Sequence, residues 1–231
     1  MTQKQKIVAW VVFLFFLEAL LIAFVDKPVS EYLRVVDKEH NGLINFFRAY
    51  TDIGLSKWYL WPAGIGVILC AIFVRIKSVG PALRKKLAVV GDKLFFLFVI
   101  VALAGIAVDI IKPVLGRARP VILLREGFYG FHPLTFDAAW KSMPSGHANT
   151  CFALACVLAV LFPRLRILWF AIAFADALSR VMVNAHYVSD VIAGAVIGCA
   201  AAYYLAQAYE RGGIARLRSG IFPIDRLGLD R

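Results

Sequence analysis

The stretch from Ser179 to Asp190 brings together residue types that suit the transfer of a phosphoryl group. It connects two apolar runs, so Arg180, His186 and Asp190 are expected where both runs reach the membrane boundary. If the second run is a helix whose first turn includes His186, the imidazole and the carboxylate of Asp190 share one helix face. The carboxylate could then hold one ring nitrogen and leave the other for attack, and Arg180 could hold phosphate oxygens. Taken alone, these are more simply interpreted as interfacial polar residues, so the case for chemistry depends on two further stretches.

Lys112–Pro120 supplies positive charge next to another apolar run. Lys112, Arg117 and Arg119 could simply extend to the interface from a helix end. A Gly-Arg-x-Arg-Pro turn, however, fixes the direction of the arginine side chains. Side chains that merely extend to the interface do not need a fixed direction. As phosphate ligands, Lys112 would act as a point charge and Arg119 as a planar hydrogen-bonding fork.

Pro144–His147 has the features of an anion-binding helix start. Ser145 is a favourable N-cap, Gly146 lets the backbone approach a ligand, and the N–H groups of a first helical turn attract anions. A simple helix cap explains Ser145 and Gly146 but not His147. Together the three stretches offer two imidazoles, one acid, several cations and a helix N-terminus, which predicts an anion site.

In this order and spacing, the three stretches resemble the signature of the type 2 phosphatidic acid phosphatase superfamily, which includes bacterial undecaprenyl-pyrophosphate and lipid A phosphatases. The matching residues are Lys112-x6-Arg119-Pro120, Pro144-Ser145-Gly146-His147 and Ser179-Arg180-x5-His186-x3-Asp190. The resemblance implies that His186 attacks phosphorus, that Asp190 orients His186, and that His147 protonates the leaving oxygen and then activates water. It also implies that the phosphate oxygens are held by Lys112, Arg119, Arg180, Ser145 and the N–H of Gly146. No metal or other cofactor is expected, because fixed cations take the part that Mg²⁺ has in kinases.

Further side chains, in these stretches and in the loop before His147, are candidate contacts to a substrate. They are Arg117, Ser179, Arg125, His132 and Trp140. The aromatic residues between positions 112 and 145 could form a lid or contact a lipid, or they could belong to an interfacial aromatic belt. His132 together with the other two histidines could suggest zinc, but the resemblance argues against a metal site.

The composition predicts an all-α integral membrane protein. Of its 231 residues, 61% are hydrophobic, and the mean hydropathy is +0.75. A helix needs about 20 apolar residues to cross a bilayer, and several runs come close to this length. We expect a single domain over residues 1–231, with six transmembrane helices and an interfacial helix after the first. The spans are predicted at about 7–25, 58–74, 94–111, 146–162, 167–180 and 188–209. The four cysteines lie in apolar runs without ligand spacing and predict neither disulfides nor a metal site.

The net charge of +11 comes mainly from basic residues at the ends of apolar runs. This pattern favours membrane orientation and anionic headgroups over nucleic-acid binding. The N-terminus, the 75–93 loop, the 163–166 turn and the C-terminal tail are basic, which places them on the cytoplasmic side. The three motif stretches then face the other side. For a bacterial inner-membrane protein, as the resemblance implies, that side is the periplasm.

These features predict a metal-independent phosphatase that removes a terminal phosphate from a membrane lipid. Undecaprenyl pyrophosphate, lipid A 1-phosphate, phosphatidylglycerophosphate and phosphatidic acid fit equally well. Two other functions stay open: a lipid phosphotransferase that uses the same residues, and a non-catalytic carrier of lipid phosphates. The bilayer itself is the expected partner, and the sequence does not determine the oligomeric state.

Overall fold

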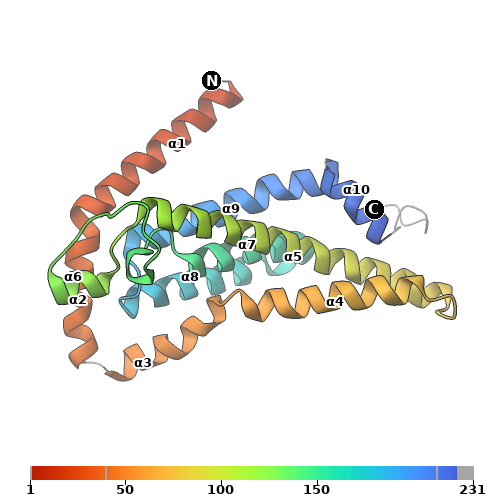
Figure 1. The fold of residues 1–231 in the computed structure, drawn as a ribbon, viewed down its shortest axis with the longest axis horizontal. Helices are drawn as coiled ribbons and strands as arrows, with labels where there is room; N and C mark the ends of the chain where they lie inside the picture. Colours follow the sequence, from red (N-terminus) through yellow and green to blue (C-terminus); the bar gives the residue numbers. More distant parts are fainter. Residues whose placement is uncertain (1, 40, 212, 223–231) are drawn as a thin grey trace.

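The computed structural model describes residues 2–39, 41–211 and 213–222, and most of them are helical (Figure 1). In chain order the helices are α1 (Gln3–Leu20), α2 (Asp26–Glu39), α3 (Asn41–Tyr50), α4 (Lys57–Arg75), α5 (Pro81–Leu115), α6 (Pro120–Glu126), α7 (Gly146–Leu161), α8 (Arg166–Met182), α9 (Val188–Arg211) and α10 (Gly213–Ile221). A π-helical turn, Leu21–Val25, joins α1 to α2, and a 3-10 turn, Thr51–Gly54, follows α3. The predicted all-α class is confirmed.

Four helical stretches among the described residues are long and apolar enough to cross a bilayer. They are Gln3–Asp37, Gly42–Arg75, Pro81–Leu115 and Val188–Tyr209. They contain the spans predicted at 7–25, 58–74, 94–111 and 188–209. The other two predicted spans correspond to α7 and α8, with 16 and 17 residues, which is shorter than the about 20 residues of a full crossing. The count of six spans therefore stays a prediction.

The segment 75–93 is not the loop that its basic residues suggested. α5 begins at Pro81, so most of this segment is helical and only a short turn connects α4 to α5. Lysine and arginine are good helix formers, and proline suits the first position of a helix. The same helix ends at Gly116, which has a φ of 59° and forms a left-handed C-cap. Lys112 therefore lies in the last turn of α5.

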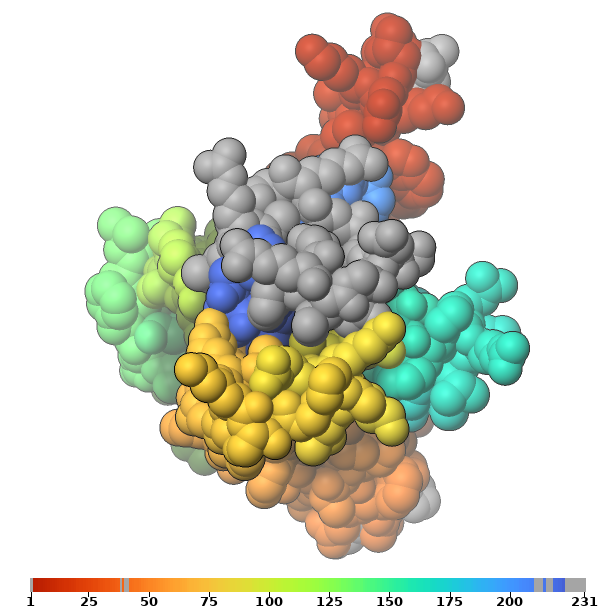
Figure 2. Space-filling view, turned by 90° about the vertical axis from the view of Figure 1, so that its right-hand side faces the viewer, coloured from red at the N-terminus to blue at the C-terminus, as the bar shows by residue number. Residues whose placement is uncertain are grey.

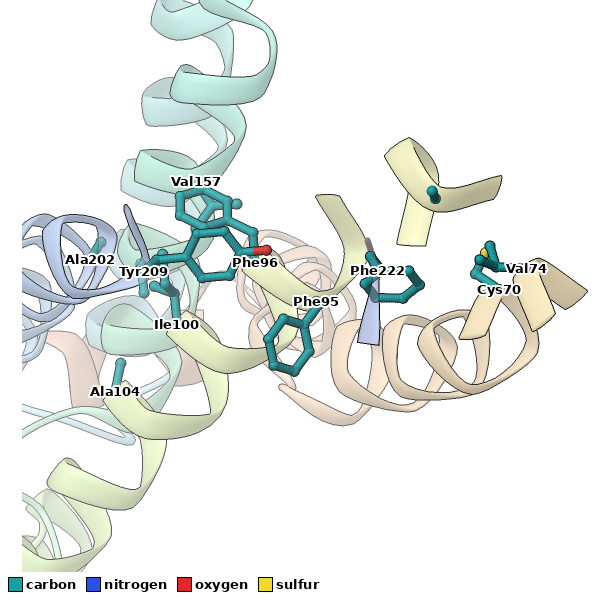
Figure 3. Packing of buried hydrophobic residues seen from close by; sticks show 12 residues of the cluster. Cys70, Val74, Phe95, Phe96, Ile100, Ala104, Val157, Ala202, Tyr209 and Phe222 are labelled. Carbon is teal, nitrogen blue, oxygen red and sulfur yellow. The ribbon is translucent and has the colours of Figure 1, made fainter. Parts of the chain in front are cut away.

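An apolar core holds the helices together towards the end where α4 and α5 join (Figure 3). Phe95 and Phe96 of α5 pack there with Tyr209 of α9 and with Phe222, which follows α10. Burying one such aromatic side chain contributes roughly 1.5–3 kcal/mol. The hydroxyl of Tyr209 also donates a hydrogen bond of 2.9 Å to the backbone carbonyl of Asp92. This core fixes α5 against α9, the two helices whose other ends carry Lys112 and Asp190.

α7 and α9 approach each other closely because α9 has glycine at two positions one turn apart. A Cβ at Gly194 would collide with the backbone of Ser145, and one at Gly198 would collide with the backbone of Asn149. The two glycines, which are four positions apart, therefore serve the packing of two helices of the same chain. It places the N-terminus of α7 against the first turns of α9.

The two ends of the bundle are built differently. α2, α3, α6 and the segment between α5 and α7 gather at one end, and the turn between α4 and α5 lies at the other (Figure 1). α2 and α3 occupy the region in which an interfacial helix was predicted. Figure 2 faces the end where α4 and α5 join, and in it the N-terminal residues (red) project beyond the rest of the chain. The polar motif stretches all lie at the α2–α3 end.

Candidate active site

The three polar stretches of the sequence meet at the end of the bundle that α2 and α3 cover. The last turn of α5 carries Lys112, the first turn of α7 carries Gly146 and His147, and the turn between α8 and α9 carries His186. A Cβ added to Gly146 would lie 3.1 Å from Lys112 Nζ, so the lysine ammonium reaches the start of α7. His147 lies within electrostatic reach of both Lys112 and His186. The two histidines therefore occupy the same region at the same end of the molecule.

His186 and Asp190 form a buried pair, with Nδ1 of the imidazole 3.5 Å from Oδ2 of the carboxylate. α9 begins at Val188, where the predicted span begins, so the condition that the first helical turn includes His186 is not met and the helix alone does not create this pair. A tight backbone turn places the ring instead. The N–H of His186 donates to the carbonyl of Arg180 at 3.2 Å, and the N–H of Tyr187 donates to Asp190 Oδ2 at 2.9 Å. Since Nδ1 faces Asp190, Nε2 is the nitrogen left for a ligand.

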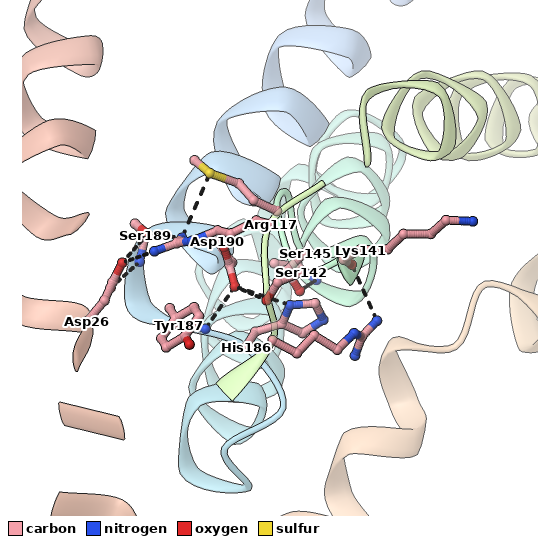
Figure 4. Close-up of polar contacts among 12 residues, drawn as sticks. Asp26, Arg117, Lys141, Ser142, Ser145, His186, Tyr187, Ser189 and Asp190 are labelled. Atoms are coloured by element: carbon pink, nitrogen blue, oxygen red, sulfur yellow. Dashed lines mark hydrogen bonds and ion pairs between the residues drawn. The ribbon is translucent and has the colours of Figure 1, made fainter. Parts of the chain in front are cut away.

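Asp190 is held by several groups besides the imidazole (Figure 4). Its Oδ1 forms an ion pair of 2.5 Å with Arg117 Nη1, and its Oδ2 accepts a hydrogen bond of 2.5 Å from the hydroxyl of Ser142. Arg117 also pairs with Asp26 through Nη2 at 2.7 Å, and the N–H of Ser189 donates to Asp26 Oδ1 at 3.0 Å. All five side chains are buried. The start of α2 therefore takes part in fixing the carboxylate that faces the imidazole.

Arg117 is not available as the substrate contact that the sequence suggested. Its side chain is 1% exposed, and its guanidinium is directed at Asp26 and Asp190. Burial by itself lowers the pKa of an arginine, but the two carboxylates outweigh burial and raise the pKa of Arg117. Arg117 is therefore a buried cation that holds two carboxylates, and its assignment as a substrate contact is corrected.

Burial lowers the pKa of His186 to about 4, although Asp190 opposes this shift. The imidazole is consequently neutral at pH 7. Neutral imidazole is the form with a lone pair that can attack an electrophile.

Lys112, Arg119 and Arg180 carry charges that no acid neutralises at close range. Among the described residues, no carboxylate oxygen lies within 4.0 Å of any of the three. Arg180 Nη1 donates to the hydroxyl of Thr51 at 2.8 Å, and its Nε is buried without a hydrogen-bond partner. Arg119 Nε donates to the carbonyl of Ala138 at 2.9 Å. Because neutral oxygens leave the charges uncompensated, this region suits an anion.

Ser145 caps α7, as its sequence position predicts. Its hydroxyl accepts from the N–H of Ala148 at 3.5 Å, and its own N–H donates to the backbone carbonyl of Asp190 at 2.8 Å. The first turn that follows begins at Gly146, beside Lys112. A helix N-terminus next to a lysine ammonium is a favourable place for a phosphate group.

The other predicted substrate contacts have different surroundings. Ser179 is fully buried, and its hydroxyl donates to the backbone carbonyl of Asp176 at 2.6 Å, so its assignment as a substrate contact is wrong. Arg125 lines a separate hollow of about 450 Å³ between α2, α6 and the end of α8. Trp140 packs against His132 with ring centroids 5.3 Å apart. In the part of the chain that the structure describes, no group of three or more His, Cys, Asp or Glu side chains could hold a metal ion.

Sequence reasoning missed three buried polar side chains at this end of the molecule: Asp26, Ser142 and Asp176. Asp26 follows the first apolar run directly, and Asp176 lies inside another. An acid in such a place usually has a partner within the bundle, so both positions gave a usable signal. The identity of the partner did not follow, since Arg117 is 91 positions away from Asp26. Ser142 gave no signal of its own.

The fold and the site define a class: a helical membrane protein with an acid-oriented imidazole and a cluster of uncompensated cations at one end of its bundle. Residues 93–213 match the family model described as the PAP2 superfamily. This match covers more than half of the chain, so the protein belongs to that family, the one its three motif stretches resemble.

Two curated relatives match about half of this chain at about 40% identity. The chain is 40% identical over 119 residues to a lipid A 1-phosphatase from Rhizobium etli, which corresponds to 52% of this chain and 51% of the relative. It is 39% identical over 119 residues to a lipid A 1-phosphatase from Rhizobium johnstonii, corresponding to 52% and 49%. The chain thus spans about half the length of the curated relatives it matches.

Two solved structures share the fold. A PAP2-type phosphatidylglycerolphosphate phosphatase from Bacillus subtilis matches with a TM-score of 0.59 at 19% identity, covering 88% of this chain and 94% of the other. LpxE from Aquifex aeolicus matches with a TM-score of 0.53 at 24% identity, covering 77% and 93%. The former is described as a transmembrane protein, which agrees with the apolar helices of this chain.

Proposed function

We propose that this protein is an integral-membrane, metal-independent lipid phosphatase that works through a phosphohistidine on His186. The observation that carries the proposal is the buried contact of 3.5 Å between His186 Nδ1 and Asp190 Oδ2, in the same region as three cations without a carboxylate neighbour among the described residues. An oriented nucleophile beside uncompensated positive charge suits a phosphate group better than a neutral ligand.

In the first step, His186 Nε2 attacks phosphorus while the bond between phosphorus and the lipid oxygen breaks, and His147 donates a proton to that oxygen. In the second step, His147 takes a proton from water, and the water oxygen attacks the phosphohistidine and releases inorganic phosphate. Lys112, Arg119, Arg180 and the first turn of α7 hold the non-bridging oxygens throughout.

The charges of the buried network support this chemistry. Asp26 and Asp190 carry two negative charges, and Arg117 between them carries one positive charge. With His186 neutral, the cluster therefore retains one negative charge. The cation that develops on the ring as phosphorus is attacked offsets that charge, which favours the transition state over the resting state.

The names of the two curated relatives make lipid A 1-phosphate the first substrate to test among the four that the sequence left open. An apolar cavity of about 350 Å³ between α1, α5 and α9 supports a lipid substrate, because it is lined by Leu115 and Val196 and reaches Pro144, next to Ser145. An acyl chain in this cavity would leave the attached phosphate near the start of α7.

We also propose that the site faces the periplasm of a bacterial inner membrane. The basic residues around the α4–α5 turn, at the opposite end of the bundle, support this orientation, since positively charged connections stay in the cytoplasm. They are Arg75, Lys77, Arg84, Lys85 and Lys86.

A phosphate-release assay on the purified protein tests the proposal with all four lipid phosphates. We expect release from at least one lipid, complete loss of release in folded His186→Ala, inhibition by vanadate, and full activity in EDTA. Unchanged activity of His186→Ala would refute the mechanism.

Product analysis and the two histidine variants separate the two alternative functions from a phosphatase. A phosphotransferase would yield a phosphorylated acceptor lipid or sugar, which mass spectrometry of the products detects. A non-catalytic carrier would still move lipid phosphate across vesicles in His186→Ala and His147→Ala, whereas a phosphatase would show loss of hydrolysis in both.

A further inference from the structure

A second buried carboxylate lies on the side of the site that carries His147. Asp176 belongs to α8, one turn before Arg180, and its side chain is fully buried. An acid inside a membrane helix is expensive to bury and is rarely kept there without a task. The mechanism described above does not use it.

Asp176 and His147 face one another across a glycine. A Cβ added to Gly54 would lie 2.5 Å from Asp176 Oδ2, 2.8 Å from Asp176 Oδ1 and 2.7 Å from His147 Cδ2. The carboxylate and the Cδ2 edge of the imidazole therefore both border the space that a side chain at position 54 would fill, and a residue larger than glycine would displace one of them. Gly54 closes the 3-10 turn that leads into α4.

The carboxylate of Asp176 is not occupied by another strong partner. Neither oxygen accepts a hydrogen bond of good geometry from the described residues; the donors that face it are the thiol of Cys151 and the amide of Gly54. Arg180, one turn away, does not pair with it within 4.0 Å, and donates to Thr51 instead. A buried carboxylate without a strong hydrogen bond can accept one from the imidazole of His147.

We propose that Asp176 is the positioning residue of His147, as Asp190 is for His186; this inference rests on the proposed phosphatase function. The charged groups around His147 are otherwise cationic, namely Lys112, Arg119 and Arg180, and cations oppose the protonated ring that an acid catalyst needs. A carboxylate next to the ring offsets them and orients it. Asp176 stays ionised throughout: the proton given to the leaving oxygen comes from His147 and is returned by the attacking water.

Among the described residues, no nitrogen of His147 lies within 4.0 Å of a carboxylate oxygen of Asp176. This distance is compatible with the role, because catalytic hydrogen bonds often shorten only when the substrate is bound. Each imidazole would then have its own buried acid. The two acids come from different helices, α8 and α9.

Dependence on the leaving group tests the proposal. Single-turnover release of the leaving group, which reports the first step alone, is measured for 4-nitrophenyl phosphate, whose nitrophenolate needs no proton, and for dodecyl phosphate, whose alkoxide does. In Asp176→Asn we expect release from dodecyl phosphate to fall by about 10²-fold, the lower range for loss of acid catalysis, and release from 4-nitrophenyl phosphate to fall by less than about 10-fold. His147→Ala should show the same selectivity, and Asp176→Glu should restore part of the lost rate.

Gly54→Ala is a second test of the proposal, and it leaves the Asp176 residue unchanged. The added methyl group should separate the carboxylate from the ring and lower release from dodecyl phosphate selectively, whereas Gly105→Ala, where a Cβ meets nothing within 4 Å, should not. The matched acid control is Asp92→Asn, since Asp92 pairs with Arg218 at 3.2 Å and lies about 30 Å of helix away from Lys112.

Equal losses on both substrates, or no loss on either, in Asp176→Asn and Gly54→Ala would overturn the inference and leave the phosphatase intact. If Asp176→Asn does not fold, Gly54→Ala and Asp176→Glu decide the question. Undiminished release by His186→Ala would instead refute the proposed function itself, so the two failures are distinguishable.

Discussion

The two imidazoles of the candidate site have opposite surroundings. On the side of His186, Asp190 is engaged by Arg117, Ser142 and the backbone of Tyr187, and every group is buried. On the side of His147, Arg119 and Arg180 donate to neutral oxygens, and a buried carboxylate accepts no well-formed hydrogen bond from the described residues.

This difference suits the two tasks that we propose for the histidines. A nucleophile must be in position before the substrate arrives, so its support is completed within the protein. Groups that bind phosphate and move a proton must instead keep their donors available until the ligand supplies the missing partners. We call the surroundings of His186 the saturated side and the surroundings of His147 the open side. Mutations on the saturated side are expected to change stability and rate together. Mutations on the open side are expected to change mainly ligand binding and proton transfer.

Breaking the saturated side at its centre should have the largest effect. In Asp190→Asn, an amide cannot stabilise the cation on His186 or enforce its tautomer, so we expect kcat to fall by about 10⁴-fold. Phosphate release from the best lipid substrate measures this, with circular dichroism as the check on folding. A loss below tenfold would mean that Asp190 does not orient the nucleophile.

The next largest effect is expected from Arg117→Met, which leaves Asp26 and Asp190 buried without their shared cation. Removing one partner of a buried ion pair costs about 3–5 kcal/mol, and kcat should fall as well because Asp190 loses a support. Unfolding in detergent and turnover are measured together. The control is Arg48→Met, which removes an exposed ion pair with Asp37 and should cost less than about 1 kcal/mol. Comparable effects of the two variants would show that the buried network does not differ from a surface pair.

Arg180→Met probes the open side. We expect the unfolding free energy to change little, while the affinity for vanadate falls by about 10- to 10²-fold, as when a charged hydrogen-bond donor is lost. Calorimetric titration measures the affinity. Arg84→Met is a matched control, because Arg84 likewise donates to neutral oxygens, the backbone carbonyls of Ile76 and Val79 at 3.1 Å, but lies near the other end of α5. Equal vanadate affinity in the two variants would contradict an anion site at Arg180.

The smallest expected effect is that of pH on the stability of the folded protein. The pKa of His186 falls from its ordinary value of 6.5 to about 4 in the folded protein, so the unfolded chain binds more protons between these values. The stability contributed by the neutral buried ring is therefore complete above pH 6.5 and is lost as the pH falls towards about 4. Melting temperatures between pH 7 and pH 4 should drop by a few degrees more in the wild type than in His186→Asn. Parallel curves would show that the ring is not buried in its neutral form.

Much of the open side could be predicted from the sequence, and much of the saturated side could not. Lys112, Arg119, Arg180 and the start of α7 are placed by short motifs whose local geometry is set within a few residues. Asp26 and Arg117 are far apart in the chain, and only packing of α2 against the end of α5 brings them together. Arg117 was misassigned for this reason: beside Arg119 in sequence it resembles another phosphate ligand, yet its side chain enters the interior.

The sequence by itself determined the all-α membrane class, the family, the two imidazoles and the residues expected to bind phosphate, because hydropathy and motif spacing are local properties of the chain. The tertiary structure alone decided which buried acids support these residues. Whether a carboxylate contacts a given cation or imidazole depends on which helices pack together and on where a glycine such as Gly54 leaves space, and neither is encoded within one stretch of sequence.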